Sequence, residues 1–357
     1  MNKIEMTRRE FLRKGSLGAL FLLGGGLNSL GSGASLLNTL LKSPAGLKPA
    51  TLLPQMDGMF MPDAEVLITA SEKWVQILPG AQTRIWGYDG ELLSGSEFVT
   101  VQSIPGSYLG PILRVKSGTR LRLIFQNDLL EDSVIHPHGL RVPEDCDGQP
   151  MQAVGPGGVK VYDFQVVDRA CPAWFHPHPH MRTAEQVAMG LAGLFYVTDT
   201  DEEIAVPGAA TGANDIPLVL QDRVFDANNQ FLYQPNQMWG YLGDRILVNG
   251  FINSALSLEP RNYRLRVLNG SNARTFKLAW SNGMPLKVIG TDGGLLPAVE
   301  SRSYITLMPG ERVDLWVDFS KAAGKQVILR SLSFSPSGGM MGGGGGGMGG
   351  GGMGGGG

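Results

Sequence analysis

The strongest constraint on the fold is a series of short segments in which apolar and polar residues alternate, broken by glycine and proline. From about Glu65 onward, residues 119–125, 159–164, 264–268 and 313–317 all follow this alternation. A period of two places successive side chains on opposite faces of a strand, and hardly any stretch shows the spacing of a helix. The sequence therefore predicts an all-β protein built from sandwiches.

The length of the chain and a weak internal sequence repeat indicate two domains. The 357 residues are 43% apolar, enough for two cores of the usual domain size. A strand with the letters RLR ends in Gln126 and Asn127 in the first half, and another ends in Asn269 and Gly270 in the second. We expect one domain at residues 55–200 and a second at 201–335. The turn-rich sequence from about 199 to 214 would mark the boundary.

The charge balance argues against a polyanionic partner. The formal net charge is −2, and no long run carries one sign. A groove for nucleic acid needs a basic stripe, which this chain lacks. We therefore expect no nucleic-acid partner.

The amino terminus resembles a twin-arginine export signal. Residues 7–14 read TRREFLRK, and an apolar stretch follows from about residue 17 to 30. A membrane anchor is the alternative, but this stretch is shorter than the ~18–20 residues that span a bilayer and contains three successive glycines. We expect residues 1–54 to be signal and linker outside the fold. The protein would then be periplasmic or extracellular, without a stable membrane span.

The carboxy-terminal segment, residues 336–357, is almost entirely glycine and methionine. Such a composition cannot bury enough apolar surface to fold, so we expect a disordered tail or interdomain connector. The alternative is that its thioether groups, which are soft ligands, hold Cu(I) loosely. The candidate ligands are Met340, Met341, Met348 and Met353.

The two cysteines, Cys146 and Cys171, are open to two interpretations. In an oxidising compartment they could form a disulfide, and they could equally be two buried thiols. Neither lies between two histidines, which limits the metal chemistry available to them.

All five histidines lie in two short sequence motifs, HPH at residues 136–138 and HPHPH at residues 176–180. Residues two apart in an extended segment project to the same side, so each His-x-His can present two imidazoles to one site. The prolines between them favour extended backbone in the preceding residue. Neutral imidazole binds copper, zinc, iron and nickel, so the pattern predicts a metal site.

A cupin site or a zinc site would fit these histidines less well. A lone His-x-His is weak evidence, because cupins, hydrolases and surface loops also contain it. A cupin would place a glutamate soon after the first pair, and Glu144 lies too far along. Five histidines also exceed what a tetrahedral zinc ion needs.

Residues flanking the histidines match a known family as well. Residues 135–148 (IHPHGLRVPEDCDG) resemble the first copper motif of multicopper oxidases, and residues 174–180 (WFHPHPH) with 186–194 (QVAMGLAGL) resemble the second. The similarity is greatest to the bacterial copper-efflux branch. Three later segments resemble the middle domain of these enzymes: residues 265–274 (LRVLNGSNAR), 291–296 (TDGGLL) and 308–312 (MPGER).

The resemblance implies plastocyanin-like (cupredoxin) Greek-key β-sandwich domains and a copper enzyme. Such enzymes couple oxidation of a donor, for example Cu(I) or a phenol, to reduction of oxygen to water. By the same resemblance His136 would hold the type 2 copper, and His138, His176 and His178 would hold the type 3 pair.

Four further positions lie near this site in sequence. His180 is one step beyond the ligating pair and would be a neighbour of the cluster or a solvated side chain. Asp147 matches an acidic position of the family and could relay protons, although an Asp-Gly pair also favours a turn. Trp174 and Phe175 would pack beneath the site and limit solvent.

The chain departs from the family in one respect. Type 1 copper needs a cysteine and two histidines, and no histidine follows His180. About half of the cluster ligands are therefore present. We expect an amino-terminal portion of a longer oxidase that lacks its third cupredoxin domain and is inactive alone.

Two competing hypotheses come from other functional classes. The chain could be a periplasmic copper-binding or copper-buffering protein that lost oxidase activity, as the methionine tail and the half-cluster suggest. It could also be a catalytically silent structural protein of this fold, although such a protein would not need both histidine pairs.

Overall fold

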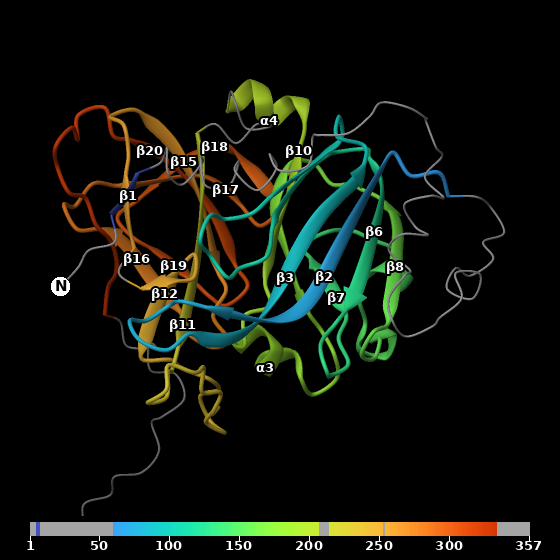
Figure 1. The fold of residues 1–357 in the computed structure, drawn as a ribbon. Coiled ribbons are helices and arrows are strands. Elements are labelled where there is room, and N and C mark those ends of the chain that lie inside the picture. The colour runs from blue at the N-terminus through green and yellow to red at the C-terminus, as the bar shows by residue number, and fades with distance from the viewer. Residues whose placement is uncertain (1–4, 8–59, 207–213, 253, 334–357) are drawn as a thin grey trace, which may run out of the picture.

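The computed structural model describes residues 5–7, 60–206, 214–252 and 254–333, and these residues form mostly β-structure (Figure 1). The first half contains two mixed sheets. Their strands are β2 (Ala64–Val75), β3 (Thr83–Ser94), β4 (Val99–Gln102), β5 (Ile112–Lys116), β6 (Arg120–Asn127), β7 (Ile135–His138), β8 (Val159–Gln165), β9 (Cys171–Pro177) and β10 (Gly193–Thr198). The orders are β3-β2-β6-β8 and β4-β5-β10-β9-β7.

The second half repeats this plan with a seven-stranded and a three-stranded sheet. The strands are β11 (Asp215–Arg223), β12 (Arg245–Val248), β13 (Phe251–Ile252), β14 (Ala255–Ser257), β15 (Asn262–Asn269), β16 (Phe276–Trp280), β17 (Leu286–Thr291), β18 (Gly294–Arg302), β19 (Ile305–Leu307), β20 (Arg312–Asp318) and β21 (Leu329–Ser331). The orders are β13-β12-β11-β15-β20-β17-β18 and β19-β16-β21.

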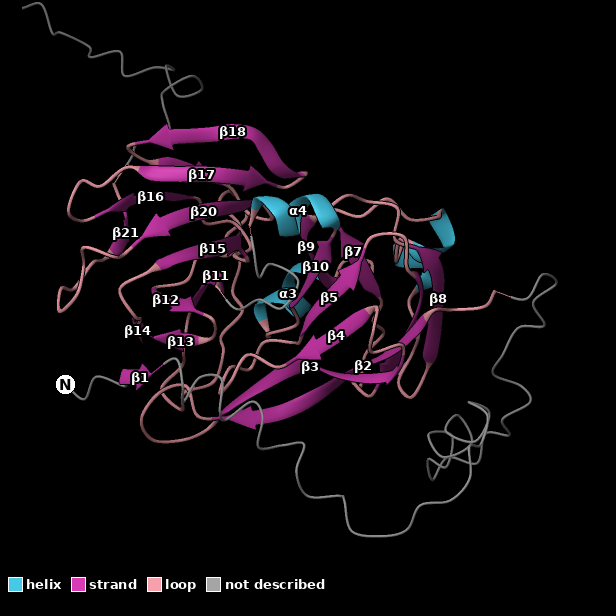
Figure 2. Cartoon of the chain, turned by 90° about the horizontal axis from the view of Figure 1, so that it is seen from above, coloured by secondary structure: helices cyan, strands magenta, loops and turns pink. Residues whose placement is uncertain are grey.

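Helices are short and few among the described residues (Figure 2). They are η3 (Glu144–Cys146), η4 (Pro150–Gln152), α3 (Thr183–Ala188) and α4 (Thr200–Ala205). Helix α4 occupies sequence that we expected to be turn. Asp199 caps it by accepting a hydrogen bond from the Glu202 amide at 2.7 Å. The all-β prediction is confirmed, and no helix of the described ranges is long and apolar enough to cross a membrane.

The alternation seen in the sequence becomes two apolar cores. Along β2 the side chains of Ala64, Val66, Ile68 and Ala70 are fully buried, while those between them are more exposed. The first core gathers the sheets of the first half together with four residues of the second, Val219, Phe231, Leu247 and Leu268, and a separate core gathers residues between Ile216 and Val317. The first core therefore continues across the seam, and the domain limits at residues 200 and 335 stay a prediction.

The sequence repeat between the two halves corresponds to a repeat in the structure. Strand β6 pairs in parallel with β2 and antiparallel with β8, and β15 pairs in the same way with β11 and β20. At the ends of these strands Asn127 and Asn269 each donate two hydrogen bonds to backbone carbonyls and accept one from the amide two residues on. The two asparagines therefore close equivalent loops.

We expected residues 1–54 to lie outside the fold, and this limit stays a prediction. Within that range, β1 (Glu5–Thr7) pairs in parallel with β14. The unpaired backbone groups of a short strand can accept another strand, which accounts for the pairing. Arg8, Arg9 and the apolar stretch of the export signal lie outside the described residues.

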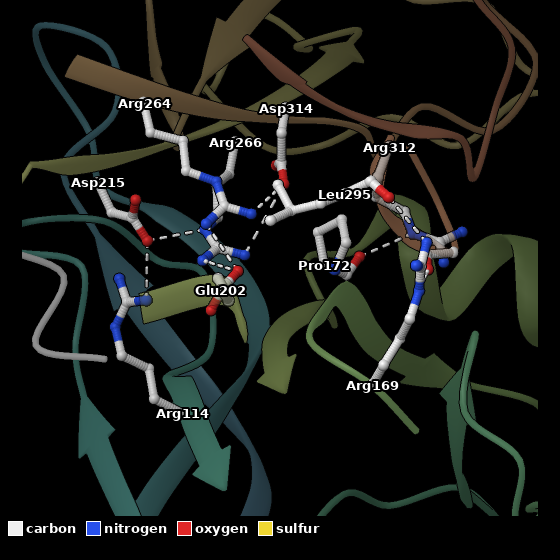
Figure 3. Close-up of polar contacts among 11 residues, drawn as sticks. Arg114, Arg169, Pro172, Glu202, Asp215, Arg264, Arg266, Leu295, Arg312 and Asp314 are labelled. Carbon is white, nitrogen blue, oxygen red and sulfur yellow. Dashed lines mark hydrogen bonds and ion pairs between the residues drawn. The ribbon is translucent and has the colours of Figure 1, made fainter. Parts of the chain in front are cut away.

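The two halves meet along a seam that contains buried charge (Figure 3). Asp215 of β11 accepts hydrogen bonds from Arg114 of β5 at 3.0 Å and Arg266 of β15 at 2.8 Å. Glu202 of α4 accepts from Arg266 at 3.0 Å and from Arg264 at 2.7 Å. Arg264 also bonds Asp314 of β20. Three arginines face three acids, so the charges balance where water is excluded.

A glycine of β10 gives a test of packing beneath the histidine strands. Gly193 lies opposite Phe175 of β9, and a Cβ at Gly193 would overlap the Phe175 ring. We expect Gly193→Ala to lower the free energy of unfolding by about 1–3 kcal/mol in chemical denaturation. Gly293→Ala is the control, because a Cβ there meets nothing within 4 Å. Equal effects of the two changes would contradict this packing.

Candidate metal centre

The histidine strands β7 and β9 lie side by side at one edge of the five-stranded sheet. They pair antiparallel, with His136 opposite His176 and His138 opposite Trp174. Strand β7 is the edge strand, where Pro137 removes no ladder bond that the sheet requires. His178 follows β9 directly, and its amide donates to the Val134 carbonyl at 3.1 Å. The strand pairing therefore includes both histidine motifs.

The imidazole rings of His136, His138, His176 and His178 converge. The ring centroid of His136 lies 5.5 Å from that of His138, 5.2 Å from His176 and 5.4 Å from His178. Candidate ligand atoms of His136, His138 and His176 all lie within 4.8 Å of one another. The shortest approach joins His138 Nδ1 to His176 Nε2 at 3.2 Å. His178 lies at the side of this triad, 6.2 Å from His176 between centroids.

Backbone carbonyls fix the orientation of two rings. His136 Nδ1–H donates to the Asp147 carbonyl at 2.7 Å, and His176 Nδ1–H donates to the Pro177 carbonyl at 2.8 Å. A carbonyl can only accept, so each Nδ1 carries the proton and each Nε2 keeps its lone pair. His178 Nδ1 is buried and has no hydrogen-bond partner among the described residues. Because His176 Nε2 keeps its lone pair, it can accept a hydrogen bond from His138 Nδ1 at 3.2 Å, and a bound ion would take the place of the shared proton.

Burial keeps two of these imidazoles neutral. Desolvation lowers the pKa of His176 to about 3, and the nearby histidines act in the same direction. Desolvation also lowers the pKa of His138 to about 4, with the positive charge of Arg312 as the next cause. A neutral imidazole is the form that binds a metal ion, so at neutral pH both rings are ready to act as ligands.

Asp147 lies beside His136 in a tight turn. Its Oδ1 is 3.3 Å from His136 Nδ1, and Gln149 Nε2 donates to its Oδ2 at 2.9 Å. Gly148 follows with a φ of 69°, and a Cβ there would overlap the Ile135 carbonyl. The Asp-Gly turn is therefore required by the backbone, and the carboxylate also contacts a ring of the cluster.

Of the two aromatic residues expected beneath the site, Trp174 packs against the histidine rings. The Trp174 ring lies 4.5 Å from that of His176 and 5.2 Å from that of His138 between centroids. Trp174 is 5% exposed and covers this side of the cluster. Phe175, the next residue along β9, points to the opposite face of the sheet, where it packs against Tyr88 and Gly193. The indole Nε1 of Trp174 is buried, and no described residue hydrogen-bonds to it.

His180 lies apart from the cluster. It is exposed and lines a surface pocket of about 390 Å³ together with Glu131, Asp132 and Arg182. No candidate ligand atom of His180 belongs to the compact histidine group found among the described residues. Met340, Met341, Met348 and Met353 lie outside the described part of the chain.

The cysteines occur as free, buried thiols, so the structure gives no disulfide between Cys146 and Cys171. Burial raises the pKa of each thiol to about 11. Both thiols are therefore protonated at neutral pH, and neither lies in the histidine group.

The second half of the chain contributes to this site, which the sequence did not predict. The turn before β20 places Gly310 next to His138. A Cβ atom added at Gly310 would lie 3.4 Å from His138 Cε1. Arg312 crosses the seam, and its Nε donates to the Pro172 carbonyl of β9 at 2.8 Å. The letters MPGER at residues 308–312 matched a family segment, but nothing in them indicated contact with a histidine.

Comparison with known proteins agrees with this geometry. A family model described as "Multicopper oxidase" matches residues 91–202, which contain all of the histidines. A multicopper oxidase of Staphylococcus haemolyticus is 38% identical over 224 residues, covering 63% of this chain and 50% of that protein. The cell division protein FtsP of Xenorhabdus nematophila is 37% identical over 236 residues, with 66% and 49% covered. The chain spans about half the length of these relatives.

Solved structures give the same result. A laccase from Pediococcus acidilactici is 36% identical with a TM-score of 0.67, and the match covers 79% of this chain and 58% of that one. The McoA multicopper oxidase of Aquifex aeolicus is 38% identical with a TM-score of 0.64, covering 73% and 56%. The fold is therefore cupredoxin-like.

The lowered histidine pKa values predict acid sensitivity of the metal-free protein. In the unfolded chain both rings take up protons below about pH 6.5, whereas in the folded protein His138 and His176 do so only near 4 and 3. The unfolded state then binds more protons, so stability falls as pH drops from 6.5 to 4. Chemical denaturation in the presence of a chelator should show a smaller fall for His138→Gln/His176→Gln. An unchanged pH dependence in this double variant would contradict the assignment.

Proposed function

The chain belongs to the multicopper oxidase family, and from this premise we propose that it is the cluster-bearing portion of a laccase-like oxidase. The oxidase would couple one-electron oxidation of Cu(I), phenols or similar donors to the reduction of oxygen to water. The observation that carries this proposal is the convergence of four imidazoles from β7 and β9.

The residues present fit copper. Two nitrogen ligands at about 2.0 Å from one ion, with a tetrahedral angle between them, lie about 3.3 Å apart. His138 Nδ1 and His176 Nε2 are separated by 3.2 Å, so they can share one ion. The unpartnered Nδ1 of His178 leaves this ring free to bind a neighbouring ion through either nitrogen. Neutral imidazole suits copper of either oxidation state.

Each residue then has a defined role. His136 would hold the type 2 copper, and His138, His176 and His178 would hold the type 3 pair. Bound copper would pass the electrons of the oxidised donor to oxygen. The carbonyl of Asp147 orients His136, and the Asp147 carboxylate, 3.3 Å from the same ring, could pass protons toward the site. Trp174 excludes water from one side of the cluster.

A complete enzyme would need ligands beyond these four. A blue-copper site takes a thiolate and two histidines, and the sequence has no histidine after His180. We infer that a third cupredoxin domain, in the same polypeptide or in another, supplies the remaining cluster ligands and the electron entry site. The twin-arginine motif supports export, so the oxidase would work in the periplasm or outside the cell.

A copper-buffering protein is the second candidate. The specific observation in its favour is the run of methionines at residues 340–353, whose thioethers could bind Cu(I) together with the half-cluster. A role in cell division, as named for the FtsP relatives, gives no reason for four imidazole rings to converge. Copper uptake separates the two copper-binding candidates from this role, and oxidase activity separates the first from the second.

Loss of two rings should remove tight copper binding. We expect His138→Gln/His178→Gln to weaken cupric ion affinity at least about a hundredfold in a chelator competition, since even partners of ligands contribute about 10–100-fold. His180→Gln is the matched control, because His180 is exposed and outside the group. Unchanged copper content in the double variant would overturn the site.

The optical spectrum tests whether electron entry needs a further domain. Both thiols are protonated and lie outside the histidine group, so the copper-loaded 357-residue chain should lack the intense blue thiolate band. It should also fail to oxidise phenols. Appearance of that band in the purified chain would refute the need for a further domain.

A further inference from the structure

A single arginine from the second half reaches the strands that carry the histidines. Arg312 begins β20 and is 7% exposed. In Figure 3 its side chain points across the seam toward Pro172 of β9. The guanidinium donates to three partners: Nε to the Pro172 carbonyl at 2.8 Å, and Nη1 to the Gly310 carbonyl at 3.0 Å and to Asp292 Oδ1 at 2.8 Å.

Arg312 occupies the place where the β7 ladder stops. Strand β7 ends at His138, opposite Trp174, and Pro172 lies two residues before Trp174 on β9. Carbonyls two residues apart on a strand face the same neighbouring strand. Beyond His138 that neighbour is missing, because Gly139 turns away with a φ of 93°. In this register the residue opposite Pro172 would be two beyond His138, and the Arg312 guanidinium supplies the donor that this residue would have supplied.

The contact with the turn after His138 is close enough to exclude other side chains. A Cβ at Gly139 would overlap Arg312 Nη2. From the other side Gly310, whose carbonyl the same guanidinium binds, lies against the His138 ring. His138 is therefore held between a backbone turn and a loop of the second half, and Arg312 bonds or contacts both.

From this arrangement we propose that Arg312 is a positioning residue of the copper cluster, which fixes His138 relative to β9 and hence to His176. The proposal rests on the proposed function for its copper readout. It assigns to the second half, which has no histidine, a direct part in shaping the site. The role requires the planar fork of arginine, because one group must reach Pro172, Gly310 and Asp292 together.

The chain offers a matched control. Arg169 also joins the halves, donating from Nε to the Gly293 carbonyl at 2.8 Å and from Nη2 to the Leu295 carbonyl at 2.9 Å (Figure 3). Neither of these bonds involves a histidine or the turn after His138. Arg169→Met removes the same kind of bond across the seam and leaves His138 untouched. Comparison with Arg312→Met separates positioning from general adhesion of the halves.

The experiment compares Arg312→Met, Arg312→Lys and Arg169→Met, first confirming folding by circular dichroism. Cupric ion is titrated against a competing chelator, and the electron paramagnetic resonance spectrum of the bound ion is recorded. We expect Arg312→Met to weaken affinity about 10–100-fold and to alter the spectrum. Arg169→Met should stay within about twofold. Arg312→Lys keeps the charge without the fork and should resemble Arg312→Met, which also provides the test if the methionine variant does not fold.

Each outcome decides the matter. Wild-type affinity in Arg312→Lys would mean that charge alone matters, and equal losses in the Arg312 and Arg169 variants would mean general adhesion. Either result overturns the proposal. If the wild-type chain binds no cupric ion, the proposed function fails separately. The His138 ring resonances of the metal-free protein, resolvable among five histidines, then decide, since they should shift with Arg312→Met and not with Arg169→Met.

Discussion

The antiparallel pairing of β7 with β9 is the interaction on which the rest of the site depends. Each strand offers imidazoles at every second residue, and the register sets His136 opposite His176. A slip of one residue would turn the opposite face of a strand toward the cluster and bring prolines where ligands should be. Because residues two apart in a strand project to one face, His136 and His138 of β7 lie on the same side of the sheet as His176 and His178. Proline at alternate positions stiffens this arrangement before any ion binds.

The second half of the molecule closes the site although it contributes no imidazole. Gly310 lies against His138, and Arg312 binds the carbonyl of Pro172 where β7 has ended. The seam behind these contacts is held by balanced buried charge around Asp215 and Glu202. Separating the halves would break the Arg114–Asp215 pair and leave the buried Arg114 without its acid, which strongly disfavours independent movement. The geometry of the histidines is thus a property of both halves together.

The residue patterns within single segments predicted the strands and the shared face of neighbouring histidines, because these features depend on local sequence. The alternation along residues 119–125 and 264–268 gave strands β6 and β15, and the His-x-His spacing gave rings on one face. We expected residues 200–205 to be turn, and they form helix α4 instead. The sequence did not indicate this helix, because the ion pairs that Glu202 makes with two buried arginines arise only in the folded chain. Arg312 was missed for the same reason: its contact with the turn after His138 depends on how two halves pack. The strand at residues 5–7 likewise depends on a distant open edge.

Copper held between His138 and His176 would join β7 to β9 through a single ion. Anomalous diffraction at the copper edge, from crystals of the copper-loaded chain, tests this directly. We predict a strong anomalous peak within bonding distance of both His138 Nδ1 and His176 Nε2. Peaks confined to His180 or to other surface groups, with none among the four converging rings, would contradict it.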